Sequence, residues 1–106
     1  MIAKTLIVDD EEMARSELKF LTEEDDRFEV LDMAKNGREA VSLLKEKSYD
    51  LVLLDIKMPG FSGIEVARLL KEFEAPPQIV FTTAYDEFAV EAFKLAAVDY
   101  LLKPIS

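Results

Sequence analysis

Short apolar runs alternate along this chain with stretches in which apolar residues recur at helical spacing. Five such runs, residues 6–8, 28–34, 51–54, 79–81 and 100–102, are typical of strands. The four stretches between them have the pattern of amphipathic helices. Because strands that alternate with helices form βαβ units, we predict an α/β domain whose parallel sheet is covered by helices on both faces. Right-handed crossovers leave few arrangements, and we expect the flavodoxin-like, doubly wound strand order 2-1-3-4-5.

The apolar positions of each predicted helix are expected to face the sheet. They are Met13, Ala14, Leu18 and Leu21 in the first helix, Ala40, Val41, Leu43 and Leu44 in the second, Ile64, Ala67, Leu70 and Phe73 in the third, and Phe88, Ala92 and Leu95 in the fourth. The pair Asn36-Gly37 predicts where the second helix begins, and Pro76-Pro77 predicts where the third ends. Residues 1–106 contain no repeat or linker, so we interpret them as one domain.

The composition excludes several classes of function. Thirteen basic residues stand against 22 acidic ones, and the net charge of −9 disfavours direct binding to nucleic acid or to an anionic membrane. The chain has no cysteine and no histidine, which excludes disulfides, thiolate chemistry, a histidine base and the usual zinc sites. The apolar runs are far too short to cross a membrane, and the first residues lack the layout of a signal peptide. We therefore expect a cytoplasmic protein without a membrane partner.

Polar residues follow four of the five predicted strands. Asp9 and Asp10 follow the first strand, Asp55 the third, Thr83 the fourth and Lys103 the fifth. Ligands of such sheets bind beyond the carboxyl ends of the strands, near the point between strands 1 and 3 where the strand order reverses. The second strand ends without a reactive side chain, as expected for an edge strand away from the site. The sequence therefore predicts that these polar residues converge at one rim of the sheet.

Three carboxylates at one rim repel one another and need a compensating charge. Two unit charges about 4 Å apart repel by about 4 kcal/mol at an effective dielectric constant near 20. Mg²⁺ suits an all-oxygen site and keeps water ligands that phosphate oxygens can replace. An alternative is that Asp9 and Asp10 only cap the helix that follows them. A bare phosphate or nucleotide site fits poorly because the loop after the first strand is acidic, and a phosphatase of the haloacid type would require an aspartate where Lys57 stands.

The residues at this rim resemble the receiver domain of bacterial two-component response regulators. The matching segments are Ile7-Val8-Asp9-Asp10, residues 54–60, Thr83-Ala84 and Lys103-Pro104, and the resemblance covers essentially the whole chain. Segments 81–89 and 99–105 are similar, more narrowly, to regulators of the LytTR type. In those regulators the receiver precedes a DNA-binding domain.

The resemblance implies a role for each acidic residue. Asp55 would accept a phosphoryl group from the phosphohistidine of a sensor histidine kinase. Asp10 and Asp55 would bind Mg²⁺ directly, and Asp9 would act through a metal-bound water. The backbone carbonyl of Lys57 would complete the set of protein ligands.

The resemblance also implies how phosphorylation is sensed. Lys103 would pair with the phosphoryl oxygens, its position set by a cis peptide bond to Pro104. Thr83 would turn its hydroxyl toward the phosphoryl group after transfer. Tyr100 would move inward as Thr83 moves. The chain would thus be a switch that promotes its own phosphorylation and dephosphorylation, rather than an enzyme with ordinary turnover.

Two alternatives remain at this stage. One is a degenerate receiver that acts, without phosphorylation, as a protein-interaction module. The other is a stand-alone Mg²⁺-dependent phosphatase. The family normally adds a fifth helix after Lys103-Pro104, whereas this sequence ends at Ser106. We therefore expect a receiver that is truncated at its C-terminus and lacks that helix. As an isolated chain it should be marginally stable, or should cover the exposed face of the sheet by self-association as a homodimer. It would contact DNA only through an absent domain.

Overall fold

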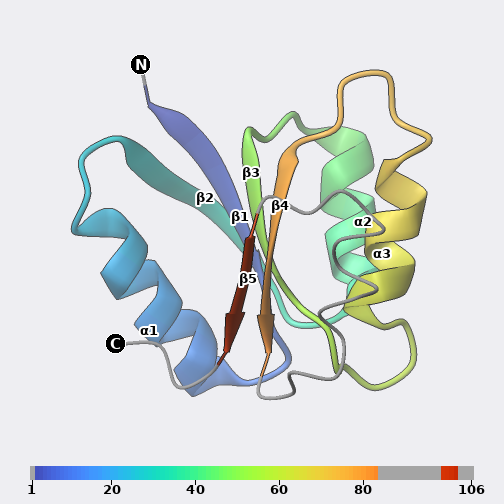
Figure 1. The fold of residues 1–106 in the computed structure, drawn as a ribbon, viewed down its shortest axis with the longest axis horizontal. Coiled ribbons are helices and arrows are strands. Elements are labelled where there is room, and N and C mark those ends of the chain that lie inside the picture. The colour runs from blue at the N-terminus through green and yellow to red at the C-terminus, as the bar shows by residue number, and fades with distance from the viewer. Residues whose placement is uncertain (1, 84–98, 103–106) are drawn as a thin grey trace.

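The computed structural model describes residues 2–83 and 99–102 of the chain. Its centre is a parallel sheet in the order β2-β1-β3-β4-β5 (Figure 1). The strands are β1 (Ala3–Val8), β2 (Phe28–Ala34), β3 (Leu51–Asp55), β4 (Gln78–Thr83) and β5 (Asp99–Leu102). The predicted order 2-1-3-4 of the first four strands is confirmed, and β2 lies at the edge of the sheet as expected. The predicted fourth helix and the end of the chain lie outside the described residues.

Helices lie on both faces of this sheet, as the alternating pattern predicted. Helix α1 (Glu12–Glu23) covers one face, and α2 (Gly37–Glu46) and α3 (Gly63–Leu70) cover the other (Figure 1). Successive residues of a strand point to opposite faces, so each inner strand contributes to two cores. The larger core lies under α2 and α3 and includes Val8, Leu54 and Phe81. The smaller core lies on the α1 side and contains Ile7, Leu18 and Leu53.

The first turns of α2 and α3 explain why these helices begin where they do. Asn36 precedes α2, and its side chain accepts a hydrogen bond of 2.8 Å from the backbone N–H of Glu39. Ser62 and Glu65 form a reciprocal capping box at the start of α3. Such caps satisfy backbone N–H groups that have no partner within the helix. The prediction that Asn36-Gly37 starts a helix is therefore confirmed.

The buried face of α1 is narrower than the sequence pattern suggested. Leu18 is buried and Ala14 and Leu21 are half-buried, but Met13 is 84% exposed. Neighbouring residues of a helix differ by about 100° around its axis. The side chains of Ala14, Leu18 and Leu21 therefore share one stripe, whereas Met13 lies to its side.

Helix α3 ends three residues earlier than the apolar spacing predicted. Its α-helical hydrogen bonds end at Leu70, whereas we expected the helix to include Phe73. The amides of Lys71, Glu72 and Phe73 instead donate to the carbonyls three residues before them. This tighter winding is common in the last turn of a helix and precedes Pro76-Pro77. Phe73 still packs, half-buried, against the larger core.

Candidate metal centre

The strand register sets a row of polar residues beside a row of apolar ones. On the α1 side of the sheet, three apolar residues from neighbouring strands lie in register: Ile7, Leu53 and Val80. Two residues further along each chain segment stand Asp9, Asp55 and Thr82, and Asp55 pairs with Thr82 in the register of β3 and β4. Because alternate residues share a face, these three side chains leave their strands on the same side as the apolar row. The carboxylates at this rim are therefore a direct consequence of strand pairing.

Asp9 is fixed in place through its backbone and its side chain. Its N–H donates to the carbonyl of Ala34 at 3.1 Å, which extends the pairing with β2 by one residue. Its carbonyl accepts from the guanidinium of Arg15 at 2.8 Å. Its Oδ1 accepts the backbone N–H of Glu11 at 2.9 Å, and the residue is fully buried. Asp9 is thus held rigidly at the start of the turn into α1.

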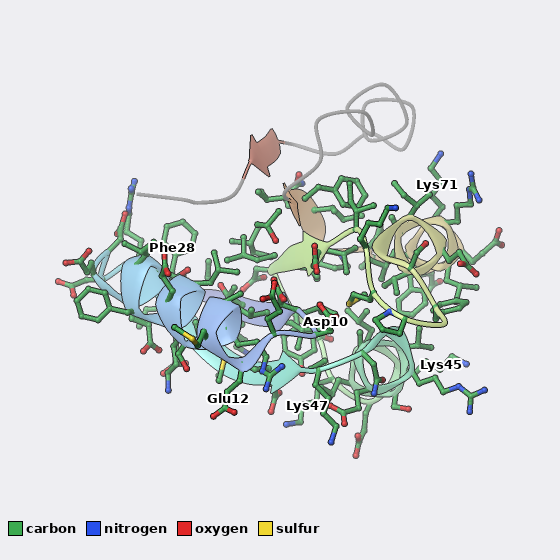
Figure 2. The ribbon with its side chains drawn as sticks, turned by 90° about the horizontal axis from the view of Figure 1, so that it is seen from below. Asp10, Glu12, Phe28, Lys45, Lys47 and Lys71 are labelled. Carbon is green, nitrogen blue, oxygen red and sulfur yellow. The ribbon has the colours of Figure 1, made fainter. Side chains whose placement is uncertain are left out.

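The alternative that Asp9 and Asp10 merely cap α1 accounts for only part of this geometry. The residue at the N-cap position is Glu11, and its side chain makes no capping hydrogen bond. Asp9 binds the N–H of Glu11, but Asp10 is exposed at the rim. Figure 2, which looks onto the ends of the strands, shows Asp10 between α1 on one side and α2 and α3 on the other.

The three aspartates of the rim come together as predicted. One carboxylate oxygen from each of Asp9, Asp10 and Asp55 can be chosen so that all three lie within 4.8 Å of one another. Oxygen ligands on opposite sides of an octahedral Mg²⁺ are about 4.2 Å apart, given metal–oxygen distances of about 2.1 Å. Small side-chain adjustments therefore bring these oxygens to a shared cation, and the purely carboxylate donor set suits Mg²⁺. The residues present fit the metal that the sequence predicted.

The backbone around Asp55 is held by a close contact with the start of α3. Asp55 is 4% exposed and ends β3. The N–H of Gly63 donates to the carbonyl of Ile56 at 2.9 Å. A Cβ atom on Gly63 would stand only 2.0 Å from the Asp55 carbonyl oxygen. Glycine is therefore required here so that the start of α3 can lie against the backbone of Asp55.

For three other predicted site residues, the structure gives the position along the strands and loops. Lys57 follows β3 in an exposed loop, one residue beyond Ile56. Thr83 is the last residue of β4, and Tyr100 of β5 pairs with Phe81 of β4. The predicted actions of their side chains remain predictions. Lys103 and Pro104 lie outside the described residues.

No pattern in the sequence singles out Thr82, although the structure places it beside Asp55. Its side chain is fully buried, and its hydroxyl has no hydrogen-bond partner among the described residues. The signal that identifies it is the spacing of two residues from Val80, which keeps both on one face of β4. That signal becomes readable only when the register between β3 and β4 is known.

A second polar cluster lies away from the rim. The Tyr49 hydroxyl donates to Asp32 Oδ2 at 2.5 Å, and Lys47 Nζ lies 3.1 Å from the same oxygen. The hydrogen bond from Tyr49, with help from Lys47, lowers the pKa of Asp32. Burial, together with the Asp32 carboxylate, raises the pKa of the Tyr49 hydroxyl. This cluster ties the segment between α2 and β3 to the edge strand β2 and has no part in the rim.

Comparison with known proteins accounts for this combination of sheet and acidic rim. Residues 5–106 match the model of the response regulator receiver domain. The chain belongs to this family. A sensory transduction protein LytR of Staphylococcus haemolyticus is 52% identical over 101 residues, which cover 95% of this chain and 40% of that protein. A positive alginate biosynthesis regulatory protein of Pseudomonas aeruginosa is 52% identical over 101 residues, covering 94% of this chain and 41% of that protein.

These relatives confirm the narrower resemblance to LytTR-type regulators. The receiver chain spans about two fifths of the length of the curated relatives it matches. No helix within the described residues is long and apolar enough to cross a membrane.

Solved structures show the same fold. The response regulatory domain of protein mrkE from Klebsiella pneumoniae superposes with a TM-score of 0.91 at 38% identity, covering 97% of this chain and 84% of that one. The regulator TrrA from Thermotoga maritima, in complex with Mg²⁺-BeF, gives a TM-score of 0.87 at 37% identity over 99% of this chain and 90% of that one.

Proposed function

We propose that this receiver is a phosphorylation-dependent switch in which Asp55 accepts a phosphoryl group with the help of Mg²⁺. The observation that carries the proposal is the meeting of three carboxylates at the ends of β1 and β3, with Asp55 in the buried position. A carboxylate is a weak nucleophile, so what it requires is positioning and neutralisation of charge. The rigid backbone around Asp55 supplies the first, and a bound cation supplies the second.

The phosphoryl donor is the phosphohistidine of a sensor histidine kinase. In the transfer, the P–N bond breaks and a P–O bond forms to a carboxylate oxygen of Asp55. The electron pair of the broken bond stays on the imidazole nitrogen, which takes up a proton. Later attack by water on phosphorus releases inorganic phosphate and restores the carboxylate. The chain therefore returns to its starting state, and each cycle consumes one phosphoryl group from the kinase and one water molecule.

The family resemblance identifies the metal ligands, and the meeting of the three aspartates at the rim supports them. Asp10 and Asp55 would hold Mg²⁺ directly, together with the backbone carbonyl of Lys57. Asp9 acts through a metal-bound water, in keeping with its buried carboxylate, one oxygen of which already accepts the N–H of Glu11. When bound, Mg²⁺ offsets the negative charge that the carboxylates and the incoming phosphoryl group bring together.

The readout of phosphorylation rests on residues that the family resemblance identifies. Lys103 pairs with the phosphoryl oxygens, and Thr83 donates its hydroxyl to them only after transfer. Tyr100 then moves inward beside Thr83. A contact that exists only in the phosphorylated state shifts the conformational equilibrium toward that state.

The output is control of transcription. The additional length of the relatives and their names as regulatory proteins support a DNA-binding domain joined to the receiver. The strongly acidic receiver itself is unsuited to contact DNA. Its partners are a sensor histidine kinase, the attached output domain and, in self-association, a second receiver.

Intact mass spectrometry tests this function directly. We expect the chain, incubated with phosphoramidate and Mg²⁺, to gain the mass of one phosphoryl group and to lose it again with time. The variant Asp55→Asn should gain nothing. Asp26→Asn, which changes an exposed aspartate far along the chain from the rim, is the matched control and should behave like the wild type.

Two results would contradict the proposal. No gain of mass in the wild type, with or without its kinase, would support a degenerate receiver that acts as an interaction module. Many turnovers on small phosphate esters, without a stable phosphorylated protein, would support the phosphatase alternative instead.

A further inference from the structure

Thr82 carries a buried hydroxyl that makes no hydrogen bond to any of the described residues. The residue is fully buried within β4, and its Oγ has no partner among the described residues. An unsatisfied buried hydroxyl is unfavourable, whereas valine has the same shape without that cost. The other fully buried threonine of the described strands, Thr5, donates its hydroxyl to the carbonyl of Ala3 at 3.3 Å. The unpaired hydroxyl of Thr82 therefore calls for an explanation.

The neighbours of Thr82 on its face of the sheet leave few partners. Below it along β4 stands Val80, which with Leu53 belongs to the apolar row and cannot accept a hydrogen bond. Beside it, one strand spacing of about 4.8 Å away, stands Asp55, its register partner on β3. Asp55 is thus the polar group nearest to Thr82 on this face among the described strands.

We propose that Thr82 is a positioning residue for Asp55. Once the site holds Mg²⁺ and a phosphoryl group, the carboxyl group of Asp55 accepts a hydrogen bond from the Thr82 hydroxyl. This inference rests on the proposed function. In the empty site the hydroxyl is unpaired, and in the loaded site it gains a bond to a carboxyl group that is held in one orientation. A bond made in only one of two states favours that state by its own free energy. Thr82 would therefore stabilise the loaded receiver and not the empty one.

The proposed role of Thr82 differs from that of Thr83. The family resemblance implies that Thr83 turns its hydroxyl toward the phosphoryl group after transfer. The proposed bond of Thr82 goes to the carboxyl group of Asp55, whereas the role implied for Thr83 concerns the phosphoryl oxygens. Thr82 acts on the carboxyl group from within the sheet, where its full burial keeps solvent from competing for the hydroxyl.

Two substitutions separate this role from a merely structural one. Thr82→Val keeps the shape of the side chain and removes the hydroxyl, and Thr82→Ser keeps the hydroxyl. Thr5→Val is the matched control, because it removes a buried hydroxyl from the same sheet, near the opposite end of β1 from the rim. The full chain of each variant is examined with and without Mg²⁺ and beryllium fluoride, a stable mimic of the phosphoryl group.

Two readouts are measured: the melting temperature without ligand, and the affinity for beryllium fluoride at saturating Mg²⁺. We expect unliganded Thr82→Val to melt at or above the wild-type temperature, because it loses an unpaired hydroxyl. We expect it to bind beryllium fluoride about tenfold more weakly, as loss of one hydrogen bond to a charged group implies. Thr82→Ser should retain most of the affinity, and Thr5→Val should melt lower but bind as the wild type does.

Wild-type affinity in Thr82→Val, or equal loss in Thr82→Ser and Thr82→Val, would overturn the inference. So would a lower melting temperature of unliganded Thr82→Val, since that would show that the hydroxyl already has a partner, such as an internal water. Failure of the wild type itself to bind beryllium fluoride would refute the proposed function and this inference together. Binding by the wild type with no effect of Thr82→Val would refute the inference alone.

Discussion

Replacing Gly63 by alanine should damage both the stability and the chemistry of this receiver. The added Cβ would lie 2.0 Å from the Asp55 carbonyl oxygen, 2.8 Å from its carbonyl carbon and 2.9 Å from Ile56 Cα. All three are backbone atoms, so no side-chain rotation relieves the contact. Since Cβ atoms essentially never come within 3.0 Å of such atoms, α3 and the end of β3 must separate by about 1 Å.

That separation displaces Asp55, the proposed phosphoryl acceptor. It strains the hydrogen bond between the Gly63 N–H and the Ile56 carbonyl and shifts the backbone that aims Asp55. We expect Gly63→Ala to lose about 3 kcal/mol of unfolding free energy, at the upper end for overpacking, as measured by urea denaturation. A misplacement of about 1 Å can cost about a hundredfold in rate, so phosphorylation by phosphoramidate should slow by that order.

Gly60→Ala is the matched control for this prediction. Gly60 lies in the loop that precedes α3 and has a φ of 78°, but a Cβ there would have no atom within 4 Å. Its cost is therefore backbone strain of about 1–2 kcal/mol, without a push on Asp55. Gly60→Ala should be less stable than the wild type yet should take up phosphoryl at close to the normal rate. Equal rates and equal stabilities in the two variants would refute the steric reasoning.

Three further predictions concern charge and capping. Asp10→Asn should raise the melting temperature without metal, because it relieves carboxylate repulsion, and should abolish most of the stabilisation by Mg²⁺; an unchanged Mg²⁺ shift would remove Asp10 from the site. Tyr49→Phe should lower the free energy of unfolding by about 2 kcal/mol at neutral pH, because it removes the hydrogen bond to Asp32. Since folding lowers the pKa of Asp32, this contribution is present above the ordinary aspartate pKa of 3.8 and is lost as the pH falls below it. Urea denaturation should therefore show that the stability of the variant depends less on pH in the acid range. Asn36→Ala should cost about 1 kcal/mol through loss of the α2 cap, whereas exposed Ser42→Ala in the same helix should cost nothing in the same denaturation assay.

Much of the fold is determined by residues that are neighbours in the chain, and it is therefore predictable from the sequence. The second strand was predicted over 28–34 and is observed over Phe28–Ala34, because alternation of half-buried and exposed residues marks an edge strand. Asn36 marks the start of α2 because its side chain caps the helix without help from distant residues. The end of α3 was missed because the change from α-helical to tighter hydrogen bonding after Leu70 leaves the apolar spacing as far as Phe73 intact.

The site was predictable to the extent that the ends of parallel strands must meet. Asp9, Asp10 and Asp55 each follow an apolar run, so a parallel sheet alone brings them to one rim. What the pattern could not supply is which backbone contacts hold them. The bond from Arg15 to the Asp9 carbonyl and the contact of Gly63 with Asp55 join segments that only the folded chain brings together.

Thr82 is an example of a residue that the register between two strands identifies and the sequence pattern alone does not. In the sequence it is one of two adjacent threonines at the end of an apolar run, and nothing local separates them. Once β3 and β4 pair with Asp55 opposite Thr82, the face that buries Leu53 and Val80 must continue as a carboxylate beside a hydroxyl. Among the described residues, the fully buried hydroxyl of Thr82 has no hydrogen-bond partner. On our proposal, only the loaded site supplies one, from the carboxyl group of Asp55. The same register that builds the core would then also link phosphorylation to β4, the strand that ends at Thr83.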